Sequence, residues 1–233
     1  MRRHEQAPVA VTGRPDVLVV VVGTGTEIGK TWVAARLLEQ WRRAGLRVSA
    51  RKPAQSFEHG EDTTDAAVLG AASGERPEVV CLPERSYPAA MAPPMAARAL
   101  GRPPVSLGDL RAELRWTNPP PQVGLVETAG GLRSPQAEDG DALDLCMLLR
   151  PDAVVLVADA GLGTINAVRL CTDALSARGL SCSVVLNRYD EGASLHAANR
   201  GWLRDRDGLG VVPGTPEGLE SLANRVAARL TAR

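Results

Sequence analysis

The stretch VVGTGTEIGKT, residues 21–31, follows an aliphatic run and leads into an amphipathic segment. The amides of such a glycine-rich turn, together with the N-terminus of the helix that follows, form a positive concavity that binds phosphate. The common phosphate-binding loop has four residues between its first glycine and Gly-Lys-[Ser/Thr]. Counting back from Gly29, this position holds Thr24, and Gly23 lies one residue too early. The context favours a nucleoside triphosphate site, and the alternative is a glycine-rich turn with a chance lysine.

The rest of the 233-residue chain alternates between short aliphatic runs and helical periodicity. Helices are predicted over residues 30–44, 164–178 and 219–230, where apolar side chains recur on one face. Continuous apolar strands separated by helices are typical of a parallel sheet covered on both faces. We therefore predict one doubly wound, mainly parallel α/β domain like that of P-loop NTPases over residues 17–233, after a flexible tail over residues 1–16. The predicted strands are 17–22, 48–51, 123–126, 153–158, 183–186 and 210–212.

The composition limits the classes of partner. Lys and Arg together number 27, as do Asp and Glu, so we expect neither nucleic acid nor a membrane surface as a partner. The aliphatic run at 17–22 is far shorter than the roughly 20 residues of a membrane span, and residues 1–16 lack the apolar core of a signal peptide. The four cysteines lie in apolar stretches without a C-x-x-C pair, which is typical of reduced core residues in a cytoplasmic protein.

A proline-rich segment over residues 76–104 interrupts the alternation of strands and helices. It is too long for a simple connection between a strand and a helix. Two interpretations remain open at this point, a functional lid and a helical excursion.

Several motifs occur in a fixed order along the chain: GTGTEIGKT, RKPAQS, TTDAAVL, VETAGG, GLGTIN and LNRYD. Together they resemble the dethiobiotin synthetase family, whose phosphate loop has the form G-T-x-T-x-[VI]-G-K-T, one residue longer than the common loop. The resemblance covers residues 17–215 and implies a ligase of biotin biosynthesis. Such enzymes close the ureido ring of dethiobiotin from 7,8-diaminononanoate, CO₂ and ATP with Mg²⁺, through a carbamate and a mixed carbamic–phosphoric anhydride.

Three residues are candidates for the phosphoryl-transfer chemistry, which requires positioning and neutralisation of charge. Lys30 would reach the terminal phosphates, and the hydroxyl of Thr31 would bind Mg²⁺. Lys52 ends the second predicted strand, at the sheet edge where ligands of open α/β folds bind. The other interpretation of Lys52 is an exposed lysine at a strand end. The resemblance favours a catalytic part for all three residues.

Two carboxylates are candidate Mg²⁺ ligands beside Thr31, because this cation prefers hard oxygen ligands. Glu127 ends an apolar strand directly before a glycine pair, where its carboxylate would face the phosphate loop. Asp65 starts a predicted helix, and there the helix dipole alone would also favour an acidic residue. The resemblance places a metal-binding aspartate at this point in the order of motifs.

The base and the rest of the nucleotide require further contacts. Asn187 ends a predicted strand, where its amide could pair with the edge of adenine or merely form a turn. The resemblance implies the following nucleotide-binding residues: Glu27, Ile28, Gly29, Lys30, Thr31, Trp32, Asp65, Glu127, Thr128, Ala129, Gly130, Asn187, Arg188, Pro213, Gly214 and Thr215.

The second glycine-rich turn, GLGTIN, lies between a predicted strand and a predicted helix. Read alone it could be a second phosphate site, but it lacks a lysine, and its helix N-terminus could instead bind a carboxylate. The resemblance implies that Gly163, Thr164, Ile165 and Asn166 bind the substrate carboxylate across the interface of a homodimer. It also implies that Ser56 contacts the substrate.

This sequence departs from the family pattern at three places. Phe57 and Thr128 stand where the family has glycines, and residues 92–97 replace S-P-H-x-A-A with APPMAA. These changes leave open a related enzyme that acts on another small substrate. A second alternative is a partition-type switch ATPase, whose loop carries an additional lysine. That lysine would fall at Gly25, and glycine cannot replace it.

Overall fold

The computed structural model of the chain describes residues 13–60 and 63–231. Most of the flexible tail predicted over residues 1–16 therefore lies outside the described residues. Within the described part of that range, Arg14 forms an ion pair with Asp152 at 3.0 Å. The backbone N–H of Asp16 donates to the Pro121 carbonyl at 3.2 Å, next to the start of the first strand.

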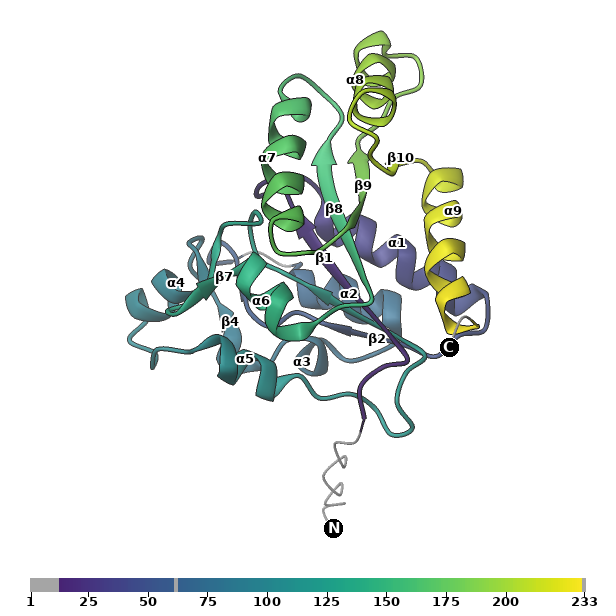
Figure 1. The fold of residues 1–233 in the computed structure, drawn as a ribbon. Helices are drawn as coiled ribbons and strands as arrows, with labels where there is room; N and C mark the ends of the chain where they lie inside the picture. The colour runs from purple at the N-terminus through teal and green to yellow at the C-terminus, as the bar shows by residue number, and fades with distance from the viewer. Residues whose placement is uncertain (1–12, 61–62, 232–233) are drawn as a thin grey trace.

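A parallel sheet forms the centre of the molecule (Figure 1). Its strands are β1 (Val17–Gly23), β2 (Val48–Arg51), β5 (Val123–Glu127), β8 (Ala153–Asp159), β9 (Cys182–Asn187) and β10 (Val211–Pro213). The strand order is β10-β9-β8-β1-β5-β2, and every pair in this sheet is parallel. The six aliphatic runs are therefore confirmed as strands of one doubly wound sheet. The strand order reverses beside β1, which carries the phosphate loop at its carboxyl end.

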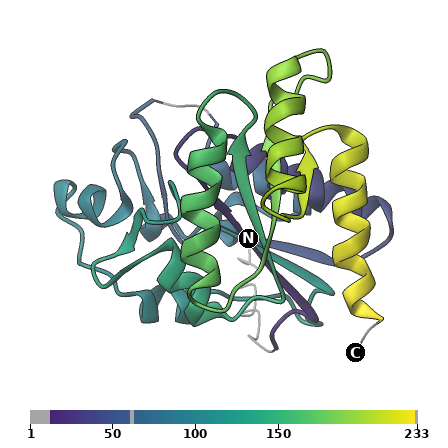
Figure 2. The same ribbon diagram turned by 45° about the horizontal axis from the view of Figure 1, so that its top comes forward.

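Helices cover both faces of this sheet (Figures 1 and 2). They are α1 (Lys30–Arg43), α2 (Asp65–Ser73), α6 (Ala142–Leu149), α7 (Thr164–Ser176), α8 (Ser194–Asp205) and α9 (Pro216–Ala227). Successive side chains of β1 point to opposite faces, as the period of a strand requires. Val19 and Val21 pack with α1, α2 and α9, whereas Val20 and Val22 pack with α6, α7 and α8. The three helices predicted from periodicity are confirmed, and α9 begins three residues earlier than expected, at Pro216.

Short elements fill the connections around the sheet. Residues 76–104 form a helical excursion, and residues 91–93 within it line a cleft. Its short strand pairs in parallel with a second one outside the main sheet. The short elements of the chain are β3 (Gln55–Ser56), α3 (Pro77–Val80), η1 (Pro83–Arg85), β4 (Ser86–Tyr87), α4 (Pro93–Ala99), α5 (Leu107–Glu113), β6 (Pro135–Ala137), β7 (Gly140–Asp141) and η2 (Ala228–Leu230).

The cysteines agree with the sequence analysis. All four thiols are free; Cys81 and Cys146 are buried, and Cys171 and Cys182 are partly buried. Burial raises the pKa of each of these thiols above its ordinary value, which keeps them in the unreactive protonated form. Across residues 13–60 and 63–231, none of the helices is both long and apolar enough to cross a bilayer.

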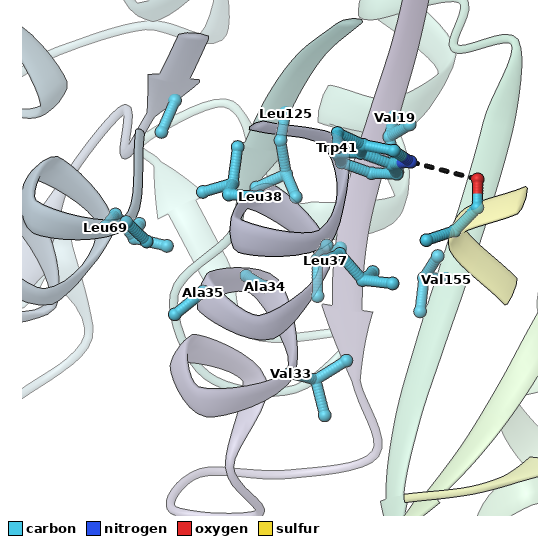
Figure 3. Packing of buried hydrophobic residues seen from close by; sticks show 14 of the residues in the cluster. Val19, Val33, Ala34, Ala35, Leu37, Leu38, Trp41, Leu69, Leu125 and Val155 are labelled. Carbon is cyan, nitrogen blue, oxygen red and sulfur yellow. Dashed lines mark hydrogen bonds between the residues drawn. The ribbon is translucent and has the colours of Figure 1, made fainter. Parts of the chain in front are cut away.

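Trp41 joins two helices on one face of the sheet (Figure 3). It lies on α1, is 1% exposed, and packs in one cluster with Val19, Leu37 and Leu38. Its indole N–H donates to the carbonyl of Ala223 on α9 at 3.0 Å. The side chain therefore contributes both apolar burial and a satisfied polar group, which is how a large aromatic residue is accommodated in a core.

We predict that Trp41→Ala lowers the free energy of unfolding by about 3–5 kcal/mol, because it leaves a cavity and an unpaired carbonyl. Trp41→Phe keeps much of the volume and should cost less. The matched control is Trp32→Ala on the same helix, where the residue is 41% exposed and the expected loss is below about 1 kcal/mol. Urea unfolding measures all three, and equal losses at the two tryptophans would contradict this description of the core.

Candidate functional site

A cleft of about 1180 Å³ lies at the carboxyl ends of β1, β2 and β5. Ligands of open α/β sheets bind at this edge, beside the strand where the order reverses. The cleft brings together residues that the sequence analysis took from several separate motifs. Of the candidate residues, those that line it are Glu27, Gly29, Lys30, Thr31, Lys52, Ser56, Asp65, Glu127, Ala129, Gly130 and Arg188.

Other candidate residues do not line this cleft in the described structure. They are Ile28, Trp32, Thr128, Gly163, Thr164, Ile165, Asn166, Asn187, Pro213, Gly214 and Thr215. Gly214 follows β10, and its N–H donates to the Leu186 carbonyl at 2.7 Å, so this turn lies against the end of β9. Trp32 faces outward under the guanidinium of Arg36, which lies 5.7 Å from its ring centroid.

The phosphate loop is fastened to the end of β9. The side-chain amide of Asn187 donates from Nδ2 to the Ile28 carbonyl at 2.9 Å. A Cβ at Gly29 would lie 2.0 Å from that nitrogen, and Gly29 has a φ of 86°, so glycine is required there. From the sequence, the Asn187 amide was predicted either to pair with the adenine edge or to form a turn. In the structure its N–H₂ group holds the loop that precedes α1, and the adenine contact stays a prediction.

Lys30 is the first residue of α1 and is 7% exposed. Its ammonium donates to the Gly25 carbonyl at 2.9 Å, within the same loop. Burial, together with repulsion from the Lys52 ammonium, lowers the pKa of Lys30 to about 8. The lysine therefore closes its own loop, and a bound anion would be a better partner for its charge than a neutral carbonyl.

Lys52 directly follows β2 and is 2% exposed. Its Nζ lies 2.6 Å from Oδ2 of Asp65 and 2.6 Å from Oε1 of Glu127. The Thr31 hydroxyl is within hydrogen-bond distance of both carboxylates, 2.7 Å from Asp65 and 2.9 Å from Glu127. We call Thr31, Lys52, Asp65 and Glu127 the Lys52 cluster. It joins the phosphate loop, β2, α2 and β5.

Burial and neighbouring charges shift the pKa values of the ionisable groups in this cluster in opposite directions. Burial alone would lower the pKa of Lys52, but the carboxylates of Glu127 and Asp65 outweigh it and raise that pKa. Burial would raise the pKa of Asp65, yet the Lys52 ammonium and the Thr31 hydroxyl hold it below its ordinary value. Burial raises the pKa of Glu127, and the Lys52 ammonium opposes this effect. The lysine is thus the positive charge that opposes protonation of both carboxylates.

The oxygens of the Lys52 cluster fit a hard divalent cation. Oε2 of Glu127 is buried and has no hydrogen-bond partner among the described residues. The described part of the chain holds no group of three or more His, Cys, Asp or Glu side chains that could bind a metal. Two carboxylates and a hydroxyl therefore suit Mg²⁺, which keeps several waters, better than a closed zinc-type site.

Two buried glutamines, which the sequence analysis did not select, position the cluster. Oε1 of Gln55 accepts from the N–H of Ala66 at 2.9 Å and so caps the helix that Asp65 begins. Gln136 is fully buried; its side chain accepts from the N–H of Ala129 at 2.9 Å and donates to the carbonyl of the same residue at 2.8 Å. This clamp fixes the loop after β5. No local sequence pattern distinguishes a buried glutamine of this kind from a glutamine on the protein surface.

Two of the three departures from the family pattern, Phe57 and part of residues 92–97, lie in the wall of the cleft. Oγ of Ser56 is buried and makes no hydrogen bond within the described residues. Phe57 and residues 91–93 line the cleft beside it, so these substitutions affect its shape. Thr128 is fully buried instead, and its hydroxyl donates to the Val21 carbonyl at 3.3 Å.

The GLGTIN turn lies at the N-terminus of α7. Gly163 has a φ of 89°, and the Thr164 hydroxyl is buried with no partner in residues 13–60 and 63–231. Asn199 of α8 supports the turn from behind by donating from Nδ2 to the carbonyls of Ala160 and Gly161, both at 2.9 Å. Residues 163–166 of this turn do not line the cleft that contains the Lys52 cluster.

Several relatives that resemble this chain share one name, that of a single enzyme family. A family model described as an AAA domain matches residues 18–220. The ATP-dependent dethiobiotin synthetase BioD of Rhodococcus jostii strain RHA1 is 38% identical over 211 residues, 89% of this chain and 89% of the relative. That of Anaeromyxobacter dehalogenans strain 2CP-C is 39% identical over 84% of this chain and 90% of the relative. That of Mycobacterium marinum is 40% identical over 71% of this chain and 72% of the relative.

A solved structure shows the same fold at low sequence identity. The signal recognition particle receptor FtsY from Elizabethkingia anophelis superposes with a TM-score of 0.52 and 16% sequence identity. The superposition covers 97% of this chain and 68% of that chain. It supports the doubly wound P-loop fold and nothing more specific.

We predict that Lys52→Met makes the stability of the protein dependent on Mg²⁺ without any nucleotide. The variant leaves two carboxylates without their counter-charge, which should cost about 3–5 kcal/mol. Millimolar MgCl₂ should restore part of this loss and raise the melting temperature by at least about 2–4 °C, equivalent to about 1 kcal/mol. Lys30→Met is the matched control, because Lys30 donates to a carbonyl instead. Equal MgCl₂ shifts in both variants and the parent protein, measured by calorimetry, would contradict the described cluster.

Proposed function

We infer the function of this chain from one premise, which is that the chain belongs to the ATP-dependent dethiobiotin synthetase family. The resemblance seen in its motifs is thereby confirmed. The chain is an ATP-dependent ligase of biotin biosynthesis that closes the ureido ring of dethiobiotin. These relatives favour the ligase over the partition-type switch ATPase.

We propose that the reaction follows three steps. One amine of 7,8-diaminononanoate adds to CO₂ and forms a carbamate. The carbamate oxygen then attacks the γ-phosphorus of ATP, so ADP leaves and a mixed carbamic–phosphoric anhydride remains. The second amine attacks the carbonyl carbon of the anhydride, which closes the ring and releases phosphate that carries the former carbamate oxygen.

The chemistry of the middle step requires positive charge around the transferred phosphoryl group. The observation that carries the proposal is that the Lys52 ammonium and the Thr31 hydroxyl, which follows the phosphate loop, both contact Oε1 of Glu127. In the proposal Lys30 leaves the Gly25 carbonyl and binds the terminal phosphates. Lys52 neutralises charge that develops on the γ-phosphate and on the attacking carbamate.

Thr31, Asp65 and Glu127 would hold Mg²⁺, and the unpartnered Oε2 of Glu127 supports this assignment. Bound there, the cation supplies charge neutralisation for the phosphates of ATP. Glu27, Ile28 and Gly29 would place loop amides against the phosphates, while the residues after β5, Thr128, Ala129 and Gly130, would close the opposite side of the loop. The remaining residues proposed to form the nucleotide site, by direct contact or by holding the loop that contacts it, are Trp32, Asn187, Arg188, Pro213, Gly214 and Thr215.

The proposed diamine site uses Ser56, whose buried hydroxyl oxygen is unpaired within the described residues and borders the cleft. We propose that Gly163, Thr164, Ile165 and Asn166 of a second copy bind the substrate carboxylate, since one chain leaves this turn outside the cleft. Leu162, next to the turn, is 93% exposed, which supports a contact with another chain at this end of α7. The unpaired thiols agree with the cytoplasm as the proposed location.

The proposed function predicts ADP release that depends on both 7,8-diaminononanoate and bicarbonate. Coupled detection of ADP, with each component omitted in turn, measures it. Lys30→Ala should lower kcat on the order of a hundredfold, by analogy with removing one charge-stabilising donor from a transition state. ADP release that is indifferent to the diamine would contradict the ring-closing function, and unchanged turnover of Lys30→Ala would contradict the role of that lysine.

If each site takes its turn from the other chain, two inactive variants should complement each other. We predict that mixed dimers of Lys52→Ala and Asn166→Asp regain at most about half of the parent activity, because one site carries both lesions and the other neither. Asn166→Asp sets a negative charge against the substrate carboxylate. Mixing Lys52→Ala with Lys30→Ala is the control and should restore nothing, since every site keeps a lesion. Inactive mixed dimers, seen to form by native mass spectrometry, would show that one chain builds each site.

A further inference from the structure

The end of β9 contributes a second side chain to the phosphate loop, beside Asn187. Arg188 follows β9, and its Nη2 donates to the Glu27 carbonyl at 2.6 Å. Its Nη1 lies 3.0 Å from Oδ2 of Asp159, which ends the neighbouring strand β8. Oδ1 of Asp159 accepts from the N–H of Gly161 at 2.8 Å, in the turn that leads to α7. We call the pair of side chains of Asp159 and Arg188 the strut, because it links the two glycine-rich turns.

The backbone at both ends of the Arg188–Glu27 hydrogen bond is in the left-handed region. Glu27 has a φ of 57° and Arg188 a φ of 54°, and among the non-glycine residues described only Arg150 shares this property. A side-chain-bearing residue pays about 1–2 kcal/mol for this conformation, so its surroundings must hold it there. Gly29, two residues after Glu27, also has a positive φ of 86°. The direction of the intervening loop amides therefore depends on the Glu27 peptide.

The strut contributes little to the stability of the fold. The side chain of Arg188 is 61% exposed and that of Asp159 is 44% exposed, and ion pairs at such positions are worth between about 0 and 1 kcal/mol. The physical effect of the strut is local: it fixes one peptide group in a loop whose amides bind an anion. Both Glu27 and Arg188 line the cleft, so this peptide lies at the site itself.

We propose that Asp159 and Arg188 are positioning residues for the nucleotide, holding the Glu27 peptide so that the phosphate loop is shaped before ATP arrives. Preforming a binding loop increases affinity by removing the ordering cost from the binding step. Through Gly161, the same strut fixes the start of the turn proposed to bind the second substrate. The inference rests on the proposed function in taking a nucleoside triphosphate as the ligand.

A different role for Arg188 predicts the opposite change in nucleotide affinity when Asp159 is replaced by Asn. If Arg188 left Asp159 to contact phosphate directly, Asp159→Asn would free the guanidinium and remove a negative charge, so nucleotide would bind more tightly. In the strut, Asp159→Asn keeps an oxygen for Gly161 but loses the acceptor for Arg188. The Glu27 peptide is then less well held, and nucleotide binds more weakly.

The test measures the Kd of a non-hydrolysable ATP analogue with Mg²⁺ by calorimetry on the full chain. We expect Asp159→Asn and Arg188→Ala each to weaken binding, the latter by about tenfold, as for loss of a hydrogen bond from a charged donor. The double variant should bind no more weakly than Arg188→Ala alone, because both changes break one linkage. Arg188→Lys should recover part of the loss. In the ring-closing assay, KM for ATP should rise while kcat at saturating ATP stays nearly unchanged.

The matched control is Arg169→Ala. Arg169 makes an exposed bidentate pair with Asp207 between α7 and the end of α8, at 2.9 and 2.6 Å, away from the phosphate loop. Arg169→Ala should leave the Kd of the ATP analogue unchanged. The melting temperature of every variant should stay within about 2 °C of that of the parent protein. Three results would overturn the proposal about the strut while leaving the proposed function in place. They are tighter nucleotide binding by Asp159→Asn, additive losses of affinity in the double variant, and affinity that falls only together with the melting temperature. A parent protein that does not bind the analogue would overturn the proposed function as well.

Discussion

The burial of the Glu127 carboxylate is the constraint on which the site depends. Glu127 ends β5 next to the central strand and is fully buried. A charge removed from water requires an opposite charge and hydrogen-bond donors, because otherwise the carboxylate would take up a proton. Lys52 supplies the charge from the neighbouring strand, and Thr31 supplies a hydroxyl from α1. One carboxylate thus fixes three elements that are distant in the sequence, and its buried Oε2, unpartnered among the described residues, is left for the proposed cation.

The phosphate loop is held on two sides by contacts of different kinds. On the β5 side, the N–H of Leu132 donates to the Gly23 carbonyl at 2.8 Å, and a Cβ at Gly131 would lie only 3.3 Å from Gly25. On the β9 side, Asn187 and Arg188 donate to successive loop carbonyls. The loop carbonyls are thus turned towards the protein, and its amides remain for an anion, which is the arrangement that a preformed phosphate site requires.

The sequence predicts the elements of this fold better than it predicts the contacts between them. Continuous aliphatic runs identify all the strands of the main sheet, since a strand buried on both faces has no polar alternation to obscure it. Lys52 and Glu127 lie together because parallel strands end at the same edge, and Asp65 joins them from the start of α2. Gln55, Gln136 and Asp159 were missed, because their partners are remote backbone groups that leave no periodic signal.

Asn187 is a residue whose position could be predicted from the sequence, although the partner of its amide could not. The strand-end position predicts a polar contact at the site, but the direction of the amide depends on how closely the phosphate loop approaches β9. The absence of a side chain at Gly29 permits that approach, and Nδ2 consequently reaches the Ile28 carbonyl. Only the assembled structure shows which of the two groups of the amide is committed to the loop.

The transfer of oxygen from carbon dioxide to phosphate tests the central claim most directly, which is that the Lys52 cluster serves phosphoryl transfer to a carbamate. The parent protein would turn over 7,8-diaminononanoate and ATP with freshly dissolved C¹⁸O₂, and ³¹P NMR would resolve the isotope shift of the released phosphate. The account predicts one ¹⁸O atom in each phosphate formed with dethiobiotin. Unlabelled phosphate, with the ring still closed, would mean that the oxygen that attacks ATP does not come from a carbamate, and would contradict the account.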